Sequence, residues 1–495
     1  MKLSTSRIAA IVIVLTFAIG VMGVSASDRA DLIIVGAGTA GLPAAITASE
    51  AGLKVVVLEK MPYTGGSLLV AGSSIAGAET RFSKALNLGD SPEKHFQESI
   101  AMGSYKNDPA LLKMYTDHAG SAIDWLADLG VTFKDNRPDF ATEHALYEIP
   151  RTYTIENGAA SVAKVLTDRA KAVGAEILLN TRAVELIQDA GGKVIGVWAV
   201  DKSGKFVRYE ADAVLLAAGG FAANIDMLKQ FKPGLSEAFS VATPSNTGDG
   251  IRMGRAIGAA TVNMSYFSCY PWAIDRGNGL FYTGAGRDAR LYGSIHVNAD
   301  GVRFVNELAE PAIVGEYVVQ QKGSTNFIIV DRAIVEAMYA DGKPLLSTWD
   351  TVEKLDAEAE SGKKYLVKAD TIAELAVKLG MDPDALTATV ARYNSFVEAG
   401  VDEDFGREQL QAKLETGPFY AVQTYVYTMS SMGGLKISTD FQVLDKDGQV
   451  IPGLFAAGMT AGGVHGERMA SGNGLGWGVT SGMLAGARIA ELISR

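Results

Sequence analysis

Residues 31–60, DLIIVGAGTAGLPAAITASEAGLKVVVLEK, constrain the fold of this chain more than any other segment. An apolar run leads into Gly36, Gly38 and Gly41, which have G-x-G-x-x-G spacing, and a second apolar run ends at Glu59, eighteen residues after Gly41. This order predicts a strand, a tight turn, a helix and a second strand that together bind a dinucleotide. The N–H groups that begin the helix favour phosphate, and the acid can accept hydrogen bonds from ribose hydroxyls.

Two later segments repeat the pattern of a buried strand that ends in glycine. They are AVLLAAGG, which ends at Gly220, and IPGLFAAGMTAGG, which ends at Gly463. Strand ends so far apart in the sequence imply one nucleotide-binding domain built from distant segments, and 495 residues are too many for one ordinary core. We therefore expect an α/β protein with a Rossmann-like domain formed by residues 28–261 and 371–495, and an α+β capping domain inserted at residues 262–370.

The N-terminus has the pattern of an export signal. Lys2 and Arg7 precede the apolar run IAAIVIVLTFAIGVMGV, and small residues follow around Ala26. The pattern predicts a Sec-type signal peptide over residues 1–27 and an exported, periplasmic protein with no membrane span after cleavage. An uncleaved membrane anchor is the alternative.

Charge and cysteine content limit the possible partners. The net charge of −11 argues against a nucleic-acid-binding protein. Cys269 is the only cysteine in the sequence, which excludes an internal disulfide and a C-x-x-C-H haem attachment site. No metal site is predicted either. If the protein exchanges electrons, a separate partner must carry them.

Eight stretches of the chain resemble the succinate dehydrogenase and fumarate reductase flavoprotein family, especially its flavocytochrome c fumarate reductases and urocanate reductases. In order along the chain they are VGAGTAGLPAAI, EKMPYTGGSLLVAGSSIAG, LLAAGGFAAN, TGDGIRMGRAIGA, DGVRFVNE, ADTIAELAVKLGMDP, SMGGLKI and IPGLFAAGMTAGGVHG. The resemblance covers about residues 31 to 490 and implies non-covalently bound FAD, a capping domain and C–C bond oxidoreduction.

The motifs and the resemblance together predict which residues contact FAD. Met459 stands where the family usually has an acid, so ribityl recognition departs from the family there. The expected cofactor contacts are Gly36, Gly38, Thr39, Ala40, Gly41, Glu59, Lys60, Gly65, Gly66, Ser67, Gly72, Ser73, Ala183, Val184, Ala218, Gly219, Asp249, Gly458, Met459, Gly472, Asn473, Gly474 and Leu475.

The resemblance fails at the positions that handle fumarate. Pro311 occupies the place of the family's proton-donating arginine, four residues after the glutamate of FVNE, and proline has no proton to give. Ser430 aligns with a carboxylate-binding histidine. Met469 aligns with a substrate-binding arginine, although Arg468 is adjacent. Fumarate is therefore not the expected substrate.

We expect the substrate site to contain Tyr270, which replaces a family histidine, together with Arg287 and Arg290 from the family's proton-relay region. Arg468 is the expected substrate-binding cation. His465 and Ser430 complete the set of catalytic candidates.

The resulting hypothesis is an FAD-dependent reductase, or desaturase, of a double bond conjugated to a carbonyl or carboxylate. The expected substrate is a bulky or aromatic enoate that receives hydride from flavin N5, and the expected electron donor is a separate cytochrome or a quinone-linked protein. A ketosteroid-type FAD dehydrogenase and a catalytically degenerate flavin-binding electron carrier remain as alternatives.

Overall fold

The computed structural model describes residues 29–140, 148–235, 239–277, 281–346 and 349–494. The expected signal peptide lies outside the described residues. Among the helices of the described segments, none has both the length and the apolar character that crossing a membrane requires.

The first sheet brings the three glycine-ended strands together. Its strand order is β18 (Gln442–Leu444), β19 (Val450–Ala456), β8 (Phe206–Leu216), β1 (Ala30–Val35), β2 (Val55–Leu58) and β5 (Glu176–Leu178). β8 is parallel to both β1 and β19, so all three carboxyl ends lie at one edge of the sheet. The expectation of one nucleotide-binding sheet from distant segments is confirmed. β6 (Arg182–Gln188) and β7 (Val194–Val200) extend β8 as an antiparallel meander.

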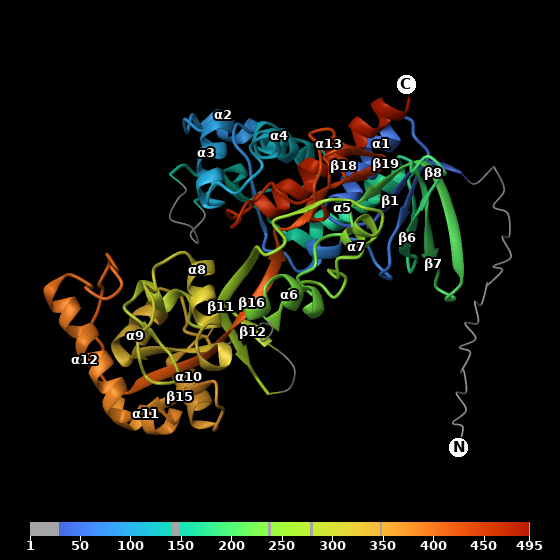
Figure 1. The fold of residues 1–495 in the computed structure, drawn as a ribbon. Coiled ribbons are helices and arrows are strands. Elements are labelled where there is room, and N and C mark those ends of the chain that lie inside the picture. The colour runs from blue at the N-terminus through green and yellow to red at the C-terminus, as the bar shows by residue number, and fades with distance from the viewer. Residues whose placement is uncertain (1–28, 141–147, 236–238, 278–280, 347–348, 495) are drawn as a thin grey trace, which may run out of the picture.

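Helices cover both faces of this sheet (Figure 1). α1 (Gly41–Glu50) packs closely on α13 (Asn473–Ile493), because a Cβ atom at Gly482 would lie 2.1 Å from the carbonyl oxygen of Ala40. The other helices of this part are α2 (Arg81–Leu86), α3 (Pro92–Met102), α4 (Pro109–Asp128), α5 (Ala159–Ala172), α6 (Ile225–Phe231) and α7 (Asp249–Ala256). Its small sheets pair β3 (Ser74–Ala76) with β4 (Thr152–Thr154) and β10 (Thr261–Val262) with β17 (Gly434–Leu435).

The second sheet has a core of its own. Its order is β12 (Phe281–Thr283), β11 (Phe267–Asp275), β16 (Phe419–Ser431), β14 (Thr325–Asp331) and β13 (Ile295–Val297), and both β9 (Phe239–Ser240) and β15 (Leu366–Ala369) pair with β16. Around it lie α8 (Pro311–Val319), α9 (Arg332–Ala340), α10 (Val352–Glu360), α11 (Ile372–Leu379) and α12 (Pro383–Ala399), at the lower left of Figure 1.

This second core continues beyond residue 370, where the sequence pattern placed the end of the insertion. Leu375, Leu386 and Tyr420 belong to the same buried cluster as Ile295. The reason is β16, whose first half pairs with β14 and β15 and whose second half pairs with β11. The long strand leads from the second core to the edge of the first sheet (Figure 1).

Candidate functional site

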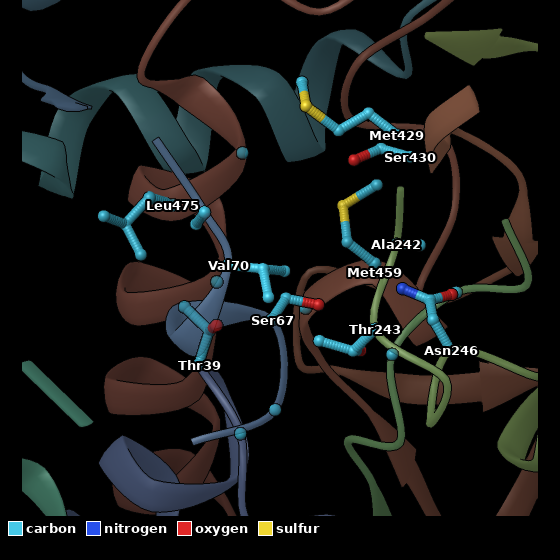
Figure 2. Close-up of a pocket in the computed structure, with 18 of the residues that line it drawn as sticks. Thr39, Ser67, Val70, Ala242, Thr243, Asn246, Met429, Ser430, Met459 and Leu475 are labelled. Atoms are coloured by element: carbon cyan, nitrogen blue, oxygen red, sulfur yellow. The ribbon is translucent and has the colours of Figure 1, made fainter. Parts of the chain in front are cut away.

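A cavity of about 890 Å³ lies at the carboxyl ends of β1, β2 and β8 and is closed on its other side by residues of β11 and β16. Figure 2 shows part of its lining, with Thr39, Ser67 and Val70 facing Met459 and Asn246 across the space. Ligands of α/β sheets bind outside the carboxyl ends of the strands, so the cavity occupies the position that the dinucleotide motif predicts.

The three glycines of the turn have two different roles, tight packing inside the protein and exposure of backbone to the cavity. Gly36 has φ +106°, and a Cβ atom there would lie 2.6 Å from the Ala217 carbonyl oxygen. A Cβ atom at Gly41 would lie 1.8 Å from the carbonyl oxygen of Gly36. Gly38 lines the cavity, and its Cβ would meet no protein atom closer than 3.9 Å. The turn therefore leaves bare backbone open to the cavity at Gly38, which fits a pyrophosphate group.

Glu59 is fixed where β2 ends. One carboxylate oxygen accepts the backbone N–H of Ala37 at 2.8 Å, and the other accepts that of Met61 at 2.8 Å. The side chain is 7% exposed and lines the cavity. Each carboxylate oxygen can accept more than one hydrogen bond, so ribose hydroxyls can be bound in addition.

Asp249 begins α7 inside a cluster of cations beside Glu59. Lys60 Nζ lies 2.7 Å from its Oδ2, Arg182 lies 3.6 Å from its Oδ1, and Arg252 also binds it. Burial alone would raise the pKa of this carboxyl, but the hydrogen bond and charge of Lys60, with Arg252 and Arg182, lower it. This end of the cavity therefore holds three cations and two carboxylates beside the expected nucleotide.

The start of α13 forms another wall. Gly472, with φ +79°, precedes the helix, and Gly474 and Leu475 line the cavity near its first N–H groups. Asn473 does not face the cavity. Its Oδ1 lies 2.9 Å from His95 Nε2 and accepts the Tyr115 hydroxyl at 3.2 Å, so it ties the helix to α3 and α4 instead of binding the cofactor directly.

Most of the expected cofactor residues line the cavity, and packing or backbone contacts account for some of the exceptions. Gly65 donates its N–H to the Ala37 carbonyl at 2.7 Å, and the Ser73 carbonyl accepts the N–H of Ile155 at 2.7 Å. Residues outside the lining are Gly41, Gly65, Ser73, Val184 and Asn473. Those in it are Gly36, Gly38, Thr39, Ala40, Glu59, Lys60, Gly66, Ser67, Gly72, Ala183, Ala218, Gly219, Asp249, Gly458, Met459, Gly472, Gly474 and Leu475.

The second sheet adds aromatic side chains. Tyr270 of β11 is the direct cross-strand neighbour of Tyr427 of β16, and both line the cavity. Their ring centroids are 5.6 Å apart, and the ring of Trp272 stacks on Tyr270 at 5.9 Å. Tyr270 therefore stands where it was expected.

Arg287 and Arg290, the two arginines expected from the proton-relay region, lie outside the cavity lining. The guanidinium of Arg290 lies over the ring of Trp272, 5.6 Å from its centroid, and the residue is 8% exposed. Arg287 pairs with Asp288 at 3.1 Å and is partly exposed. The structure does not bring either arginine together with Tyr270 at the cavity surface.

The C-terminal loop departs from expectation at its charges. Arg468 donates to the Ser104 hydroxyl at 2.5 Å and lies 3.5 Å from Glu467, so Met469 lines the cavity in its place. His465 is fully buried outside the lining, and burial lowers its pKa to about 3, which keeps it neutral. The expected positions of Arg468 and His465 in the site are therefore corrected.

Ser430 lies in the cavity as expected, beside Met429 (Figure 2). Sequence reasoning missed further lining residues, including Thr243, Asn246, Thr283, Tyr427 and Met429. The signal that identifies one of them is the β11–β16 register, which pairs Tyr427 with Tyr270. The register depends on pairing between residues far apart in the sequence, so it cannot be predicted from the sequence of either strand alone.

A Rossmann-like sheet with a dinucleotide turn, covered by a second sheet at the cavity, defines this molecule as a dinucleotide-binding α/β protein. The family model described as "FAD binding domain" matches residues 31–475. A curated "Fumarate reductase (cytochrome)" of Shewanella frigidimarina is 33% identical over 467 residues, which cover 94% of this chain and 77% of the relative. The "Urocanate reductase" of Eggerthella lenta is 34% identical over 440 residues, 87% of this chain and 70% of the relative.

Among solved structures, the open conformation of a flavocytochrome c3 fumarate reductase superposes with a TM-score of 0.76 and 28% identity, covering 95% of this chain and 79% of the other. The chain belongs to the succinate dehydrogenase/fumarate reductase flavoprotein family. Its cofactor is FAD, and it is an FAD-dependent oxidoreductase that acts on C–C bonds.

Proposed function

We propose that the protein reduces, or in reverse forms, a double bond conjugated to a carbonyl or carboxylate in a bulky or aromatic molecule. The observation that carries the proposal is the composition of one continuous cavity. Its lining joins the dinucleotide turn at Gly38 to the aromatic pair Tyr270 and Tyr427. Aromatic rings favour a flat, conjugated partner.

The lining fits FAD as well as a substrate. Gly38 and Gly66 expose backbone, Glu59 accepts hydroxyl donors, and Gly474 and Leu475 belong to the first turn of α13, whose N–H groups have no partner within the helix. When bound there, FAD supplies the two-electron chemistry that reduction of a C–C double bond requires. The protein's own tasks are to bind the alkene, exclude water and deliver a proton.

Fumarate is disfavoured as a substrate by the side chains that replace the family's fumarate-binding residues. Pro311 is the first residue of α8, where proline is favourable because its missing N–H would have no partner in the helix. Ser430 and Met469 line the cavity without supplying a positive charge. A dicarboxylate would lose the charge-assisted hydrogen bonds that each contribute about 1.5–3 kcal/mol.

The electron donor or acceptor is proposed to be a separate protein, a cytochrome or a quinone-linked carrier, because the sequence contains no haem attachment motif. Export to the periplasm is proposed from the N-terminal pattern of Lys2, Arg7 and the apolar run that follows.

The test is reoxidation of the reduced protein. Purified holoprotein is reduced without oxygen by stoichiometric dithionite and mixed with aryl acrylates, aryl enones or steroid enones while flavin absorbance is recorded. Reoxidation by aryl substrates supports the proposal. Reoxidation by steroid enones alone would favour a ketosteroid-type dehydrogenase, and reoxidation by none of them an electron carrier.

Tyr270 is proposed to deliver the proton. Tyr270→Phe should lower kcat by about 10²- to 10⁴-fold, because general acid catalysis contributes that range, while FAD stays bound. Tyr427→Phe is the matched control: it removes a hydroxyl from the paired ring in the same cavity. Steady-state rates with a reduced viologen dye measure both variants. A large loss in Tyr427→Phe with normal turnover in Tyr270→Phe would contradict the assignment.

A further inference from the structure

Two of the cations expected at the substrate site, Arg468 and Arg290, have other partners. The aromatic end of the cavity is the part lined by Tyr270 and Tyr427. Arg468 is held by Ser104 and Glu467 on its own side of the C-terminal loop. Arg290 is buried with its guanidinium against the ring of Trp272, which in turn stacks on Tyr270. Neither positive charge reaches the surface of the cavity in the described part of the chain.

The charged side chains that do line the cavity belong to its nucleotide end or are acidic. Lys60 and Arg182, together with Arg252, surround Asp249, so each of these cations already has a carboxylate partner. Asp139, which is exposed, also lines the cavity and would repel an anion. An anionic substrate would therefore find no uncommitted positive charge among these groups.

The aromatic end itself offers apolar and hydroxyl groups. Met429 contributes a thioether, which packs well against aromatic faces, and Tyr270 and Tyr427 contribute their rings. A second thioether of the lining, that of Met469, lies beside Gly474 at the start of α13. Ser430 contributes a hydroxyl that can donate one hydrogen bond to a carbonyl oxygen. Such a lining stabilises a flat neutral molecule and disfavours a carboxylate, because a charge removed from water without a partner is strongly destabilised.

We infer that the substrate is an uncharged aryl alkene whose double bond is conjugated to a ketone, ester or amide carbonyl, and not to a carboxylate. This inference rests on the proposed function and narrows its substrate class. In the reduction the alkene π bond is replaced by two C–H bonds: one carbon receives hydride from reduced FAD, which is thereby oxidised, and the other receives a proton from a cavity hydroxyl. The negative charge that develops during transfer falls on the carbonyl oxygen, to which a hydroxyl of the lining can donate a hydrogen bond.

The test compares cinnamamide with cinnamate, which have nearly the same shape and differ in charge. Oxidation of a reduced viologen dye by the holoprotein gives kcat/KM for each, and calorimetry with the oxidised holoprotein gives each Kd without turnover. We expect cinnamamide to exceed cinnamate by about 100-fold in kcat/KM and to bind correspondingly more tightly. Methyl cinnamate should behave as the amide does.

The variant Met469→Arg places a cation in the lining and should shift the amide-to-acid ratio toward cinnamate by about tenfold or more. Met469→Leu keeps the site neutral at similar volume and should leave the ratio near that of wild type. The ratio of the cinnamamide and cinnamate affinities of Met469→Leu, measured by calorimetry, separates an effect of charge from an effect of changed packing.

Two results would overturn the inference, and they are distinguishable. Equal or better use of cinnamate by wild type, lost in Arg468→Ala, would show that Arg468 turns into the cavity, and the proposed reductase function would stand. Failure of the reduced holoprotein to be reoxidised by either compound or by the ester would remove the aryl-alkene function together with the inference.

Discussion

Replacing Gly38 by valine should leave a folded chain that binds FAD at least about 100-fold more weakly, which corresponds to about 2.8 kcal/mol. The new side chain would meet no protein atom closer than 3.9 Å at its Cβ, so folding has no reason to fail. Its methyl groups would enter the cavity where backbone must approach the cofactor. Titration of the apoprotein with FAD, followed by flavin fluorescence, measures the loss.

Gly41→Val is the informative contrast, because the same turn should then fail structurally. Its Cβ would lie 1.8 Å from the Gly36 carbonyl oxygen and 3.4 Å from the side chain of Ile34, both inside the protein. We expect little folded material with or without FAD, as judged by circular dichroism. Gly191→Ala, in an exposed hairpin turn, is the matched control. Wild-type FAD affinity in Gly38→Val would contradict the assignment of the cavity to the cofactor.

The fold could be predicted from the sequence where the signals are local. Glycine at strand ends, the acid at position 59 and the apolar runs before them depend on a few neighbouring residues, and each therefore marked its strand correctly. The extent of the second core was harder to predict. β16 pairs in turn with β14, β15 and β11, and nothing within residues 419–431 says which partners it will find.

The candidate site divides in the same way. Positions such as Gly38 and Gly458 could be identified because glycine lets the backbone approach a ligand closely. The direction of a side chain in the C-terminal loop could not be predicted, since adjacent residues point to different sides. Arg468 reaches Ser104, and Met469 faces the cavity. Asn473 shows the same effect at the start of a helix. Its side chain accepts a hydrogen bond from Tyr115 of α4, whereas the next residue, Gly474, lines the cavity.

Three buried histidines should make the free energy of unfolding fall steeply in mild acid. Burial is the main cause that lowers the pKa of His95 to about 3, of His296 to about 4 and of His465 to about 3. In the unfolded chain each imidazole takes up a proton near pH 6.5, about where free histidine titrates. Because the folded pKa values are lower, the unfolded state binds more protons below pH 6.5. Stability is therefore complete above that pH and is lost as the pH falls toward 4.

The size of this effect makes it measurable. Each histidine should reduce the free energy of unfolding by about 2 kcal/mol between about pH 7 and about pH 5, so the three together remove about 6 kcal/mol, a large part of a typical domain's 5–15 kcal/mol. Urea unfolding of FAD-saturated protein at both pH values measures the difference. His296→Gln should remove about one third of the pH dependence. Equal unfolding free energies at the two pH values would mean that these imidazoles can be protonated in the folded state, which their complete burial opposes.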